Sequence, residues 1–264
     1  MPAFAKAQPR PLEKVTAKRT KPDILSRHPG LLGKLADETA ETLRKKGWRG
    51  LVEEKRGRSA MNPGVGELPH EAAATLDFLR RHGAPVHTSD PPKTPAELQA
   101  AADRGPHPSA RVHQEFLWEE VLDMCKRRHT MVLPMSVVKK IKGARVSPPG
   151  VIPQQDRRAR TVCDLTDAAS PEPGVNPNTV PLAPSEAMQF GQALCRLLLQ
   201  IYRADPRWGP VYIAKDDVSD GFYNICVNAD GVKKFGIILP TPDGQEPLVL
   251  FFLALPMGWV SVPP

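Results

Sequence analysis

The residues best suited to chemistry stand together in the stretch KDDVSDGFYNI, from Lys215 to Ile225. It holds Asp216, Asp217 and Asp220, and two aromatic residues follow at once. Residues 211–214, VYIA, form a short apolar run of the β type, so the acids are expected where a buried strand leaves the core. A carboxylate there is held rigidly yet reaches solvent, as a Mg²⁺ ligand must. Asp217 is the candidate ligand and Asp216 its rival, while an acidic surface turn is the structural alternative.

The elements around this stretch alternate between helical and extended patterns. An amphipathic helix is predicted from His113 to His129, and a second one from Ser185 to Tyr202. The second has an apolar stripe, expected to be buried, of Phe190, Leu194, Leu197, Leu198 and Ile201. After the acids, Phe235–Leu239 and Leu248–Leu253 read as two strands joined by the turn residues TPDGQ. The predicted class is therefore α+β.

The first part of the chain has a different composition. Residues 1–60 carry 15 Lys and Arg against 7 Asp and Glu, whereas the whole chain has a net charge of +7. Such a basic segment suits a polyanion such as nucleic acid, and a solvated arm is the alternative. We expect residues 1–111 to be mostly flexible, with short helices at 31–46, ended by Gly47, and at 69–82. The segment 84–110 reads as a linker with one or two helical turns near 96–102.

Cysteine spacing and hydropathy indicate the cellular compartment in which the chain is expected. Its four cysteines form no CxxC pair, which favours a reduced, intracellular protein in the cytoplasm or nucleus. No apolar run approaches eighteen residues, and the first thirty residues lack a signal-peptide core. The sequence therefore argues against membrane insertion and secretion.

Four segments in order resemble a known family. RARTVCDL (Arg158–Leu165), the helix before the acids, DVSDGFYNI (Asp217–Ile225) and LPMGWVSVPP (Leu255–Pro264) resemble the fingers and the first half of the palm of a retrotransposon reverse transcriptase. The resemblance covers 112–264. It implies a partial right-hand polymerase, with fingers plus an incomplete palm, preceded by the basic, Pro-rich segment 1–111.

The resemblance also implies an activity and its ligands. The family carries out RNA-directed DNA synthesis, a nucleotidyl transfer in which two Mg²⁺ ions, with Mn²⁺ as an alternative, stabilise the attacking and leaving oxygens. Asp217 matches the carboxylate that bridges both ions, and the carbonyl of Val218 would be a further ligand. Asp217 is preferred to Asp216 because Asp220 and Phe222 then fall in the family's register.

The remaining matched residues would bind the incoming deoxynucleoside triphosphate. Phe222 matches the aromatic residue under its sugar, which excludes a 2′-hydroxyl, although a core Phe is the alternative. Arg160 matches the fingers arginine that contacts base and phosphates, and Arg158 is a candidate for a neighbouring contact. Met257 and Gly258 would lie close to the nucleotide and template. An RNA or DNA template-primer is the second expected partner, and the rest of a polyprotein is a third.

The matched region stops before the family's second carboxylate motif. We therefore expect no appreciable polymerase activity from residues 1–264 alone, and exposed apolar edges on the hairpin at 235–253. Two alternatives stay open at this stage. One is a non-catalytic nucleic-acid-binding remnant of a retroelement, and the other is an unrelated Mg²⁺ enzyme that binds a phosphorylated small molecule.

Overall fold

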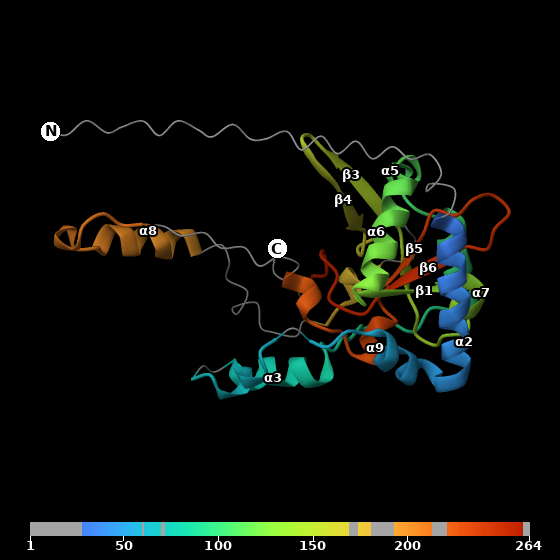
Figure 1. Cartoon of the computed structure of the whole chain (residues 1–264), viewed down its shortest axis with the longest axis horizontal. Coiled ribbons are helices and arrows are strands. Elements are labelled where there is room, and N and C mark those ends of the chain that lie inside the picture. The colour runs from blue at the N-terminus through green and yellow to red at the C-terminus, as the bar shows by residue number, and fades with distance from the viewer. Residues whose placement is uncertain are drawn as a thin grey trace.

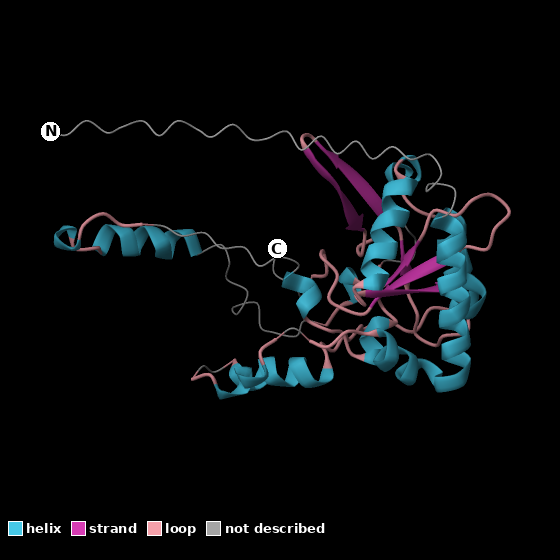
Figure 2. Ribbon diagram, viewed as in Figure 1, coloured by secondary structure: helices cyan, strands magenta, loops and turns pink. Residues whose placement is uncertain are grey.

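The computed structural model describes residues 28–59, 61–69, 72–168, 174–180, 193–212 and 221–260. Within these ranges the protein is of the mixed α+β class, as the sequence predicts, with helices around a four-stranded sheet and a separate two-stranded hairpin (Figure 2). None of the described helices is long and apolar enough to cross a membrane.

The four-stranded sheet contains β1 (Thr130–Pro134), β2 (Val146–Ser147), β5 (Gly236–Ile238) and β6 (Leu248–Phe252), in the order β1-β6-β5-β2. The β5–β6 hairpin confirms the two strands and the turn expected at 235–253. The prediction that this hairpin has exposed apolar edges is wrong. β1 pairs antiparallel with β6 and β2 pairs parallel with β5, so segments far away in the sequence cover both sides of the hairpin.

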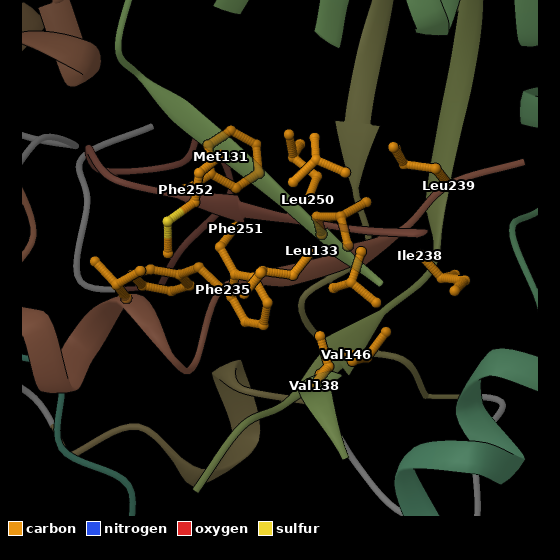
Figure 3. Packing of buried hydrophobic residues seen from close by; sticks show 14 of the residues in the cluster. Met131, Leu133, Val138, Val146, Phe235, Ile238, Leu239, Leu250, Phe251 and Phe252 are labelled. Carbon is orange, nitrogen blue, oxygen red and sulfur yellow. The ribbon is translucent and has the colours of Figure 1, made fainter. Parts of the chain in front are cut away.

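Two helices pack on this sheet and build the core. Both α2 (His28–Lys55) and α6 (Gln114–Lys126) contact β1, and they also contact each other. The ring of Trp48 in α2 meets Phe251 of β6 edge-on at 5.6 Å between centroids. The indole nitrogen of Trp118 in α6 donates a hydrogen bond of 2.9 Å to the carbonyl of Pro240. Around these contacts the sheet residues form a continuous apolar cluster (Figure 3).

Helix α2 is interrupted where the sequence places a stop signal. Gly47 has φ 68° and ψ 178°, which is not helical, and the chain resumes a helix that ends at Lys55. The predicted helix at 31–46 is confirmed, and a second helical segment follows it. The bend places Trp48 so that its Nε1 donates to the carbonyl of Ala229 at 2.6 Å, next to α9 (Ala229–Val232).

Residues 28–111 form regular helices that pack into the core. The prediction that residues 1–111 are mostly flexible is therefore wrong for this range. They contain α3 (Ala73–His82), α4 (Pro95–Arg104) and α5 (Pro108–Val112) in addition to α2. Their buried side chains share one cluster with residues after 112, so the core does not follow the boundary expected there. Amphipathic helices and single buried residues such as Val86 supply this packing, which composition alone does not reveal. Residues 1–27 lie outside the described ranges.

Strands β3 (Pro149–Gln154) and β4 (Arg157–Cys163) form an antiparallel hairpin of their own. It extends away from the four-stranded sheet, and Asp156 takes φ 59° in its turn (Figure 1). Between β1 and β2 the chain forms the short α7 (Met135–Val138). From β1 to β3 the chain is thus largely extended, with one helical turn in it.

The helix α8 (Ala193–Arg203) confirms part of the helix expected at 185–202, whose first residues lie outside the described ranges. The prediction that its apolar stripe is buried is wrong, because Leu197 and Leu198 are 41% and 55% exposed. The strand expected from Val211 is also wrong over its described residues. Val211 and Tyr212 belong to no strand and are exposed. Apolar periodicity correctly predicted a helix for α8. It does not indicate whether another element covers the apolar face of that helix.

Candidate functional site

The hairpin strand β4 carries the two arginines that the family resemblance assigns to nucleotide binding. Arg160 lies opposite Ile152 of β3, and both Arg158 and Arg160 are exposed. Along the strand, exposed residues alternate with half-buried ones, as expected for a strand with one face toward the rest of the protein. Ala159, Thr161 and Cys163 are the half-buried set.

An open pocket of about 170 Å³ lies between β4, α6 and the sheet. Arg158 and Arg160 line one side of it, Met257 and Tyr223 line others, and apolar sheet side chains such as Phe252 form the floor. Burial raises the pKa of the Cys163 thiol in this pocket to about 12. That thiol is therefore neutral at ordinary pH and is neither a nucleophile nor a ready metal ligand.

Arg160 meets the Leu255–Val260 segment directly. Its Nη2 lies 3.2 Å from the sulfur of Met257, 97 residues further along the chain. A thioether is a weak acceptor, and Arg160 forms no ion pair with an acid in the described part of the chain. Among the described residues, most of its donor capacity is therefore unused.

Arg158 is held differently. Its Nη2 forms an ion pair of 2.6 Å with Glu120 of α6, and its guanidinium lies 5.4 Å from the centre of the Phe116 ring. Glu120 thus offsets the charge of Arg158 and fixes its head group against α6. Among the described residues, acidic side chains therefore offset the charge of Arg160 less than that of Arg158.

The loop after β4 holds the Leu255–Val260 segment in place. The Asn176 amide nitrogen donates to the carbonyl of Gly258 at 2.9 Å, and its amide oxygen accepts from the backbone nitrogen of Val260 at 3.0 Å. Trp259 is buried, and its Nε1 donates to the hydroxyl of Thr179 at 3.1 Å. Gly258 has φ 97°, which favours glycine. The segment is therefore fixed by three hydrogen bonds from the 176–179 loop.

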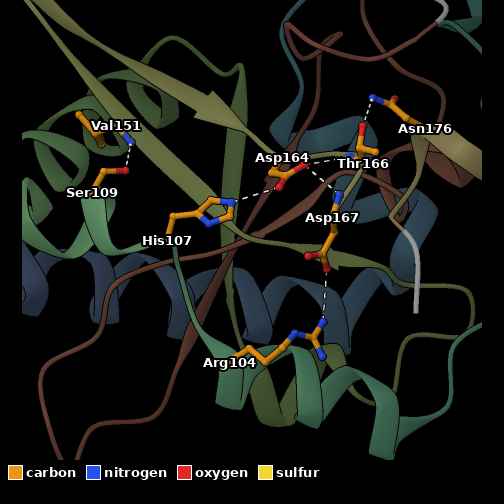
Figure 4. A network of polar contacts seen from close by, with 8 residues as sticks. All are labelled: Arg104, His107, Ser109, Val151, Asp164, Thr166, Asp167 and Asn176. Atoms are coloured by element: carbon orange, nitrogen blue, oxygen red, sulfur yellow. Dashed lines mark hydrogen bonds and ion pairs between the residues drawn. The ribbon is translucent and has the colours of Figure 1, made fainter. Parts of the chain in front are cut away.

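That loop is itself anchored by a polar network (Figure 4). Asp164, the last residue of the matched fingers pattern before Leu165, accepts from the backbone nitrogens of Thr166 and Asp167 at 3.2 and 2.8 Å. Its other oxygen lies 3.1 Å from Nε2 of His107. Arg104 donates to Asp167 at 3.3 Å. Asp164 therefore positions the loop and does not face the pocket beside Arg160.

The aromatic pair is divided between the core and the pocket. Both residues lie in a single 3₁₀ turn from Gly221 to Asn224. Phe222 is half-buried and packs against the core, whereas Tyr223 lines the pocket. The Tyr223 ring stacks on His129 at 5.0 Å and lies parallel to Phe252 at 6.4 Å. Tyr223 and Phe252 are the aromatic residues that line this pocket together with Arg160 and Met257.

The predicted metal ligands lie outside the described residues. Asp217 and Val218, together with Asp216 and Asp220, fall in the range 213–220. Within the described ranges there is no group of three or more His, Cys, Asp or Glu side chains that could hold a metal ion. Mg²⁺ binding by Asp217 and Val218 therefore stays a prediction.

The structure brings together some of the predicted residues and adds others. Arg158, Arg160 and Met257 line one pocket, as the resemblance implies for a shared ligand, and Gly258 follows directly. Glu120, Asn176 and Tyr223 gain roles that sequence reasoning did not assign. Tyr223 stands beside Phe222 in the aromatic pair, which is a usable signal, but Glu120 looks like any polar residue of an amphipathic helix. Nothing in the local sequence marks Asn176.

No protein-family model matches this chain, and no curated protein matches it.

Proposed function

We propose that this chain is the fingers and first half of the palm of a retrotransposon-type reverse transcriptase, and that its pocket binds the incoming deoxynucleoside triphosphate. In the complete protein the activity would be RNA-directed DNA synthesis. The observation that carries the proposal is the contact of Arg160 with Met257 in a pocket also lined by Tyr223. Three segments that resemble the family in sequence order thereby supply one site.

The residues of this pocket suit a phosphorylated ligand. The Arg160 guanidinium offers several N–H donors in a planar fork, which matches two oxygens of a phosphate. Its Met257 contact is weak and easily replaced by a charged acceptor. Arg158 adds a second cation, weakened by Glu120. The ring of Tyr223, which lines the pocket, offers an aromatic surface for a sugar or base.

Magnesium enters this proposal through the resemblance alone. The Asp217 carboxylate and the Val218 carbonyl would hold it, and Asp217 precedes Gly221 of the pocket-side turn by four residues. When bound, Mg²⁺ would compensate the charge of the triphosphate. Arg160 and Tyr223 would bind and orient the nucleotide.

The proposal is tested by nucleotide binding to the purified chain. We expect Arg160→Ala to weaken the binding of a fluorescent deoxynucleoside triphosphate about tenfold, since a charge-assisted phosphate contact contributes roughly 1.5–3 kcal/mol. Arg157→Ala is the matched control, because Arg157 is on the same strand, is exposed and does not line the pocket. Equal losses in both variants would contradict a nucleotide site at Arg160.

A further inference from the structure

A second site lies where α2 ends, away from the pocket just described. An open cleft of about 770 Å³ is lined by five arginines: Arg56, Arg58, Arg80, Arg81 and Arg128. They come from the end of α2, the segment after it, the last turn of α3 and the residues after α6. Glu53 is the one acidic side chain in its lining. The cleft is therefore strongly cationic.

Three of these arginines are held in fixed positions. Asp77 of α3 accepts from Nε and Nη2 of Arg80 at 3.0 and 2.8 Å, and pairs with Arg81 at 2.6 Å. Arg128, with φ 63°, donates from Nη2 to the backbone carbonyl of Glu54 at 2.5 Å. The one carboxylate of Asp77 offsets only part of this charge. The three side chains are thus preorganised cations, which lowers the entropy lost on binding an anion.

The other two arginines are not compensated. Arg56 and Arg58 form no ion pair with any acid in the ranges that the structure describes. Arg56 is half-buried and Arg58 is exposed. Cations gathered in this way repel one another, so a bound polyanion would stabilise the cleft.

The lining indicates which anion fits. None of the described residues that line it is aromatic, so this part of the cleft offers no aromatic surface on which a base would stack. Guanidinium groups and the side-chain amide of Asn62 suit phosphate oxygens. A series of phosphates in an open cleft, without base contacts, corresponds to the backbone of a nucleic-acid strand.

The cleft adjoins the segment that enters the nucleotide pocket. Ser59 donates to the carbonyl of Asn224 at 3.3 Å, and Cys226 donates from its sulfur to the carbonyl of Gly57 at 3.5 Å. Gly57 also donates to the carbonyl of Arg128 at 3.3 Å. Tyr223, in the same short segment, lines the pocket of Arg160. A strand bound in the cleft would therefore run beside the turn that carries Tyr223.

We propose that the five-arginine cleft binds the phosphate backbone of a nucleic-acid strand, independently of its sequence. The proposal rests on the proposed function in taking a nucleic acid as the ligand. It adds the site, and it assigns that site to α2, α3 and the 56–63 segment. These elements precede the region that resembles a polymerase, whereas Arg128 of the same cleft lies within it.

The experiment measures binding of a mixed-sequence, 20-nucleotide RNA to the whole chain by fluorescence anisotropy, over a series of salt concentrations. The double variant Arg56→Glu with Arg58→Glu is expected to bind at least about tenfold more weakly, with a salt slope shallower by about 2. The matched control is Lys34→Glu with Lys45→Glu, which makes the same charge change on exposed positions of α2 outside the cleft. The control is expected to keep most of the affinity and the full salt slope.

The alternatives have separate outcomes. Equal losses in both double variants would show that net charge alone acts, and would overturn the proposal. Tripolyphosphate that competes as well as RNA, at equal phosphate concentration, would indicate a free-phosphate site and overturn it too. Circular dichroism of each variant checks folding, and Arg56→Ala with Arg58→Ala, a milder change, must lower affinity in the same direction.

Failure of this inference can be told from failure of the proposed function. Arg160→Ala and Asp217→Asn are expected to leave RNA binding in the cleft unchanged. Loss of RNA binding only in the Arg56 and Arg58 variants supports the cleft even if no nucleotide binds at Arg160. Conversely, nucleotide binding that depends on Arg160, with RNA binding unaffected by Arg56 and Arg58, would support the pocket and overturn the cleft.

Discussion

Single residues in this protein carry charge in surroundings that differ sharply. Arg160 has a thioether as its described partner, whereas Arg158 is paired with Glu120. Asp167 is a buried carboxyl, with 8% of its side chain exposed, and its partner Arg104 lies 3.3 Å away. Tertiary contacts thus decide how far the charges of Arg158 and Arg160 are offset. They also decide how strongly Asp167 holds its proton, and the sequence shows none of these contacts.

Asp167 is expected to make stability depend on pH in an unusual direction. Burial raises the pKa of its carboxyl above the ordinary value of 3.8, and Arg104 offsets this only in part. The folded protein therefore binds the proton more tightly than the unfolded chain. This contribution to stability is full below about pH 3.8 and is lost as pH rises through the raised pKa. Asp167→Asn cannot lose a proton, so its stability relative to the unmodified chain is expected to rise through that window.

Urea unfolding at several pH values from about 2 to 7 measures this difference. Asp205→Asn is the control of opposite sign. The hydrogen bond from Arg207 lowers the pKa of Asp205, so its contribution is present above pH 3.8 and lost as pH falls. A relative stability of Asp167→Asn that stays constant across the window would contradict the burial argument.

At the scale of elements, the break in α2 decides where the arginine cleft begins. Gly47 takes φ 68° and ψ 178°, a conformation that essentially only glycine adopts, and the segment from Trp48 to Lys55 then leads to Arg56. The break is a local sequence signal, but its consequence is tertiary. It directs Trp48 onto Phe251 and the end of the helix toward Arg128.

Gly47→Ala is expected to destabilise the protein by about 1–3 kcal/mol, because alanine is strained at this φ and ψ. The free energy of unfolding by urea is the measurement. Gly33→Ala on the same helix is the matched control: it has open space around the added methyl group and no positive φ. That variant is expected to stabilise by about 0.5–1 kcal/mol. A loss at Gly33 as large as at Gly47 would mean that backbone strain is not the cause.

At the scale of the whole molecule, the amino-terminal helices and the sheet form one folding unit. The core cluster runs from Leu32 to Trp259. A buried ion pair joins the two parts: Arg145, 4% exposed and just before β2, pairs with Asp90 before α4. The Nε and Nη1 atoms of Arg145 have no hydrogen-bond partner among the described residues. Such a pair is costly to break from one side only.

Arg145→Met is expected to destabilise the chain by about 3–5 kcal/mol, because it leaves Asp90 largely buried without its partner. The double variant Arg145→Met with Asp90→Leu is expected to recover most of that loss. Thermal and urea unfolding of both variants measure the effect. The exposed pair of Arg207 with Asp205 supplies the comparison, and Arg207→Met is expected to change stability far less than Arg145→Met. No recovery in the double variant would argue against the buried-charge explanation.

The sequence by itself determined the local elements. The α6 helix, the β5–β6 hairpin and the stop at Gly47 follow from apolar periodicity, turn residues and glycine, all of which act between near neighbours. Sequence order also placed Arg160 and Met257 on a list of candidates for one site. Asp217 remains a prediction, since it lies outside the described residues.

Only the tertiary structure decided what each element touches. It covered the β5–β6 hairpin with β1 and β2, left Leu197 and Leu198 of α8 exposed, and brought helices from residues 28–111 into the core. It placed Tyr223, together with Arg160, in the pocket, and gathered five arginines from three parts of the chain. These outcomes depend on contacts between residues tens to hundreds of positions apart. Local pattern carries no information about such contacts, because burial and pairing are properties of the packed chain.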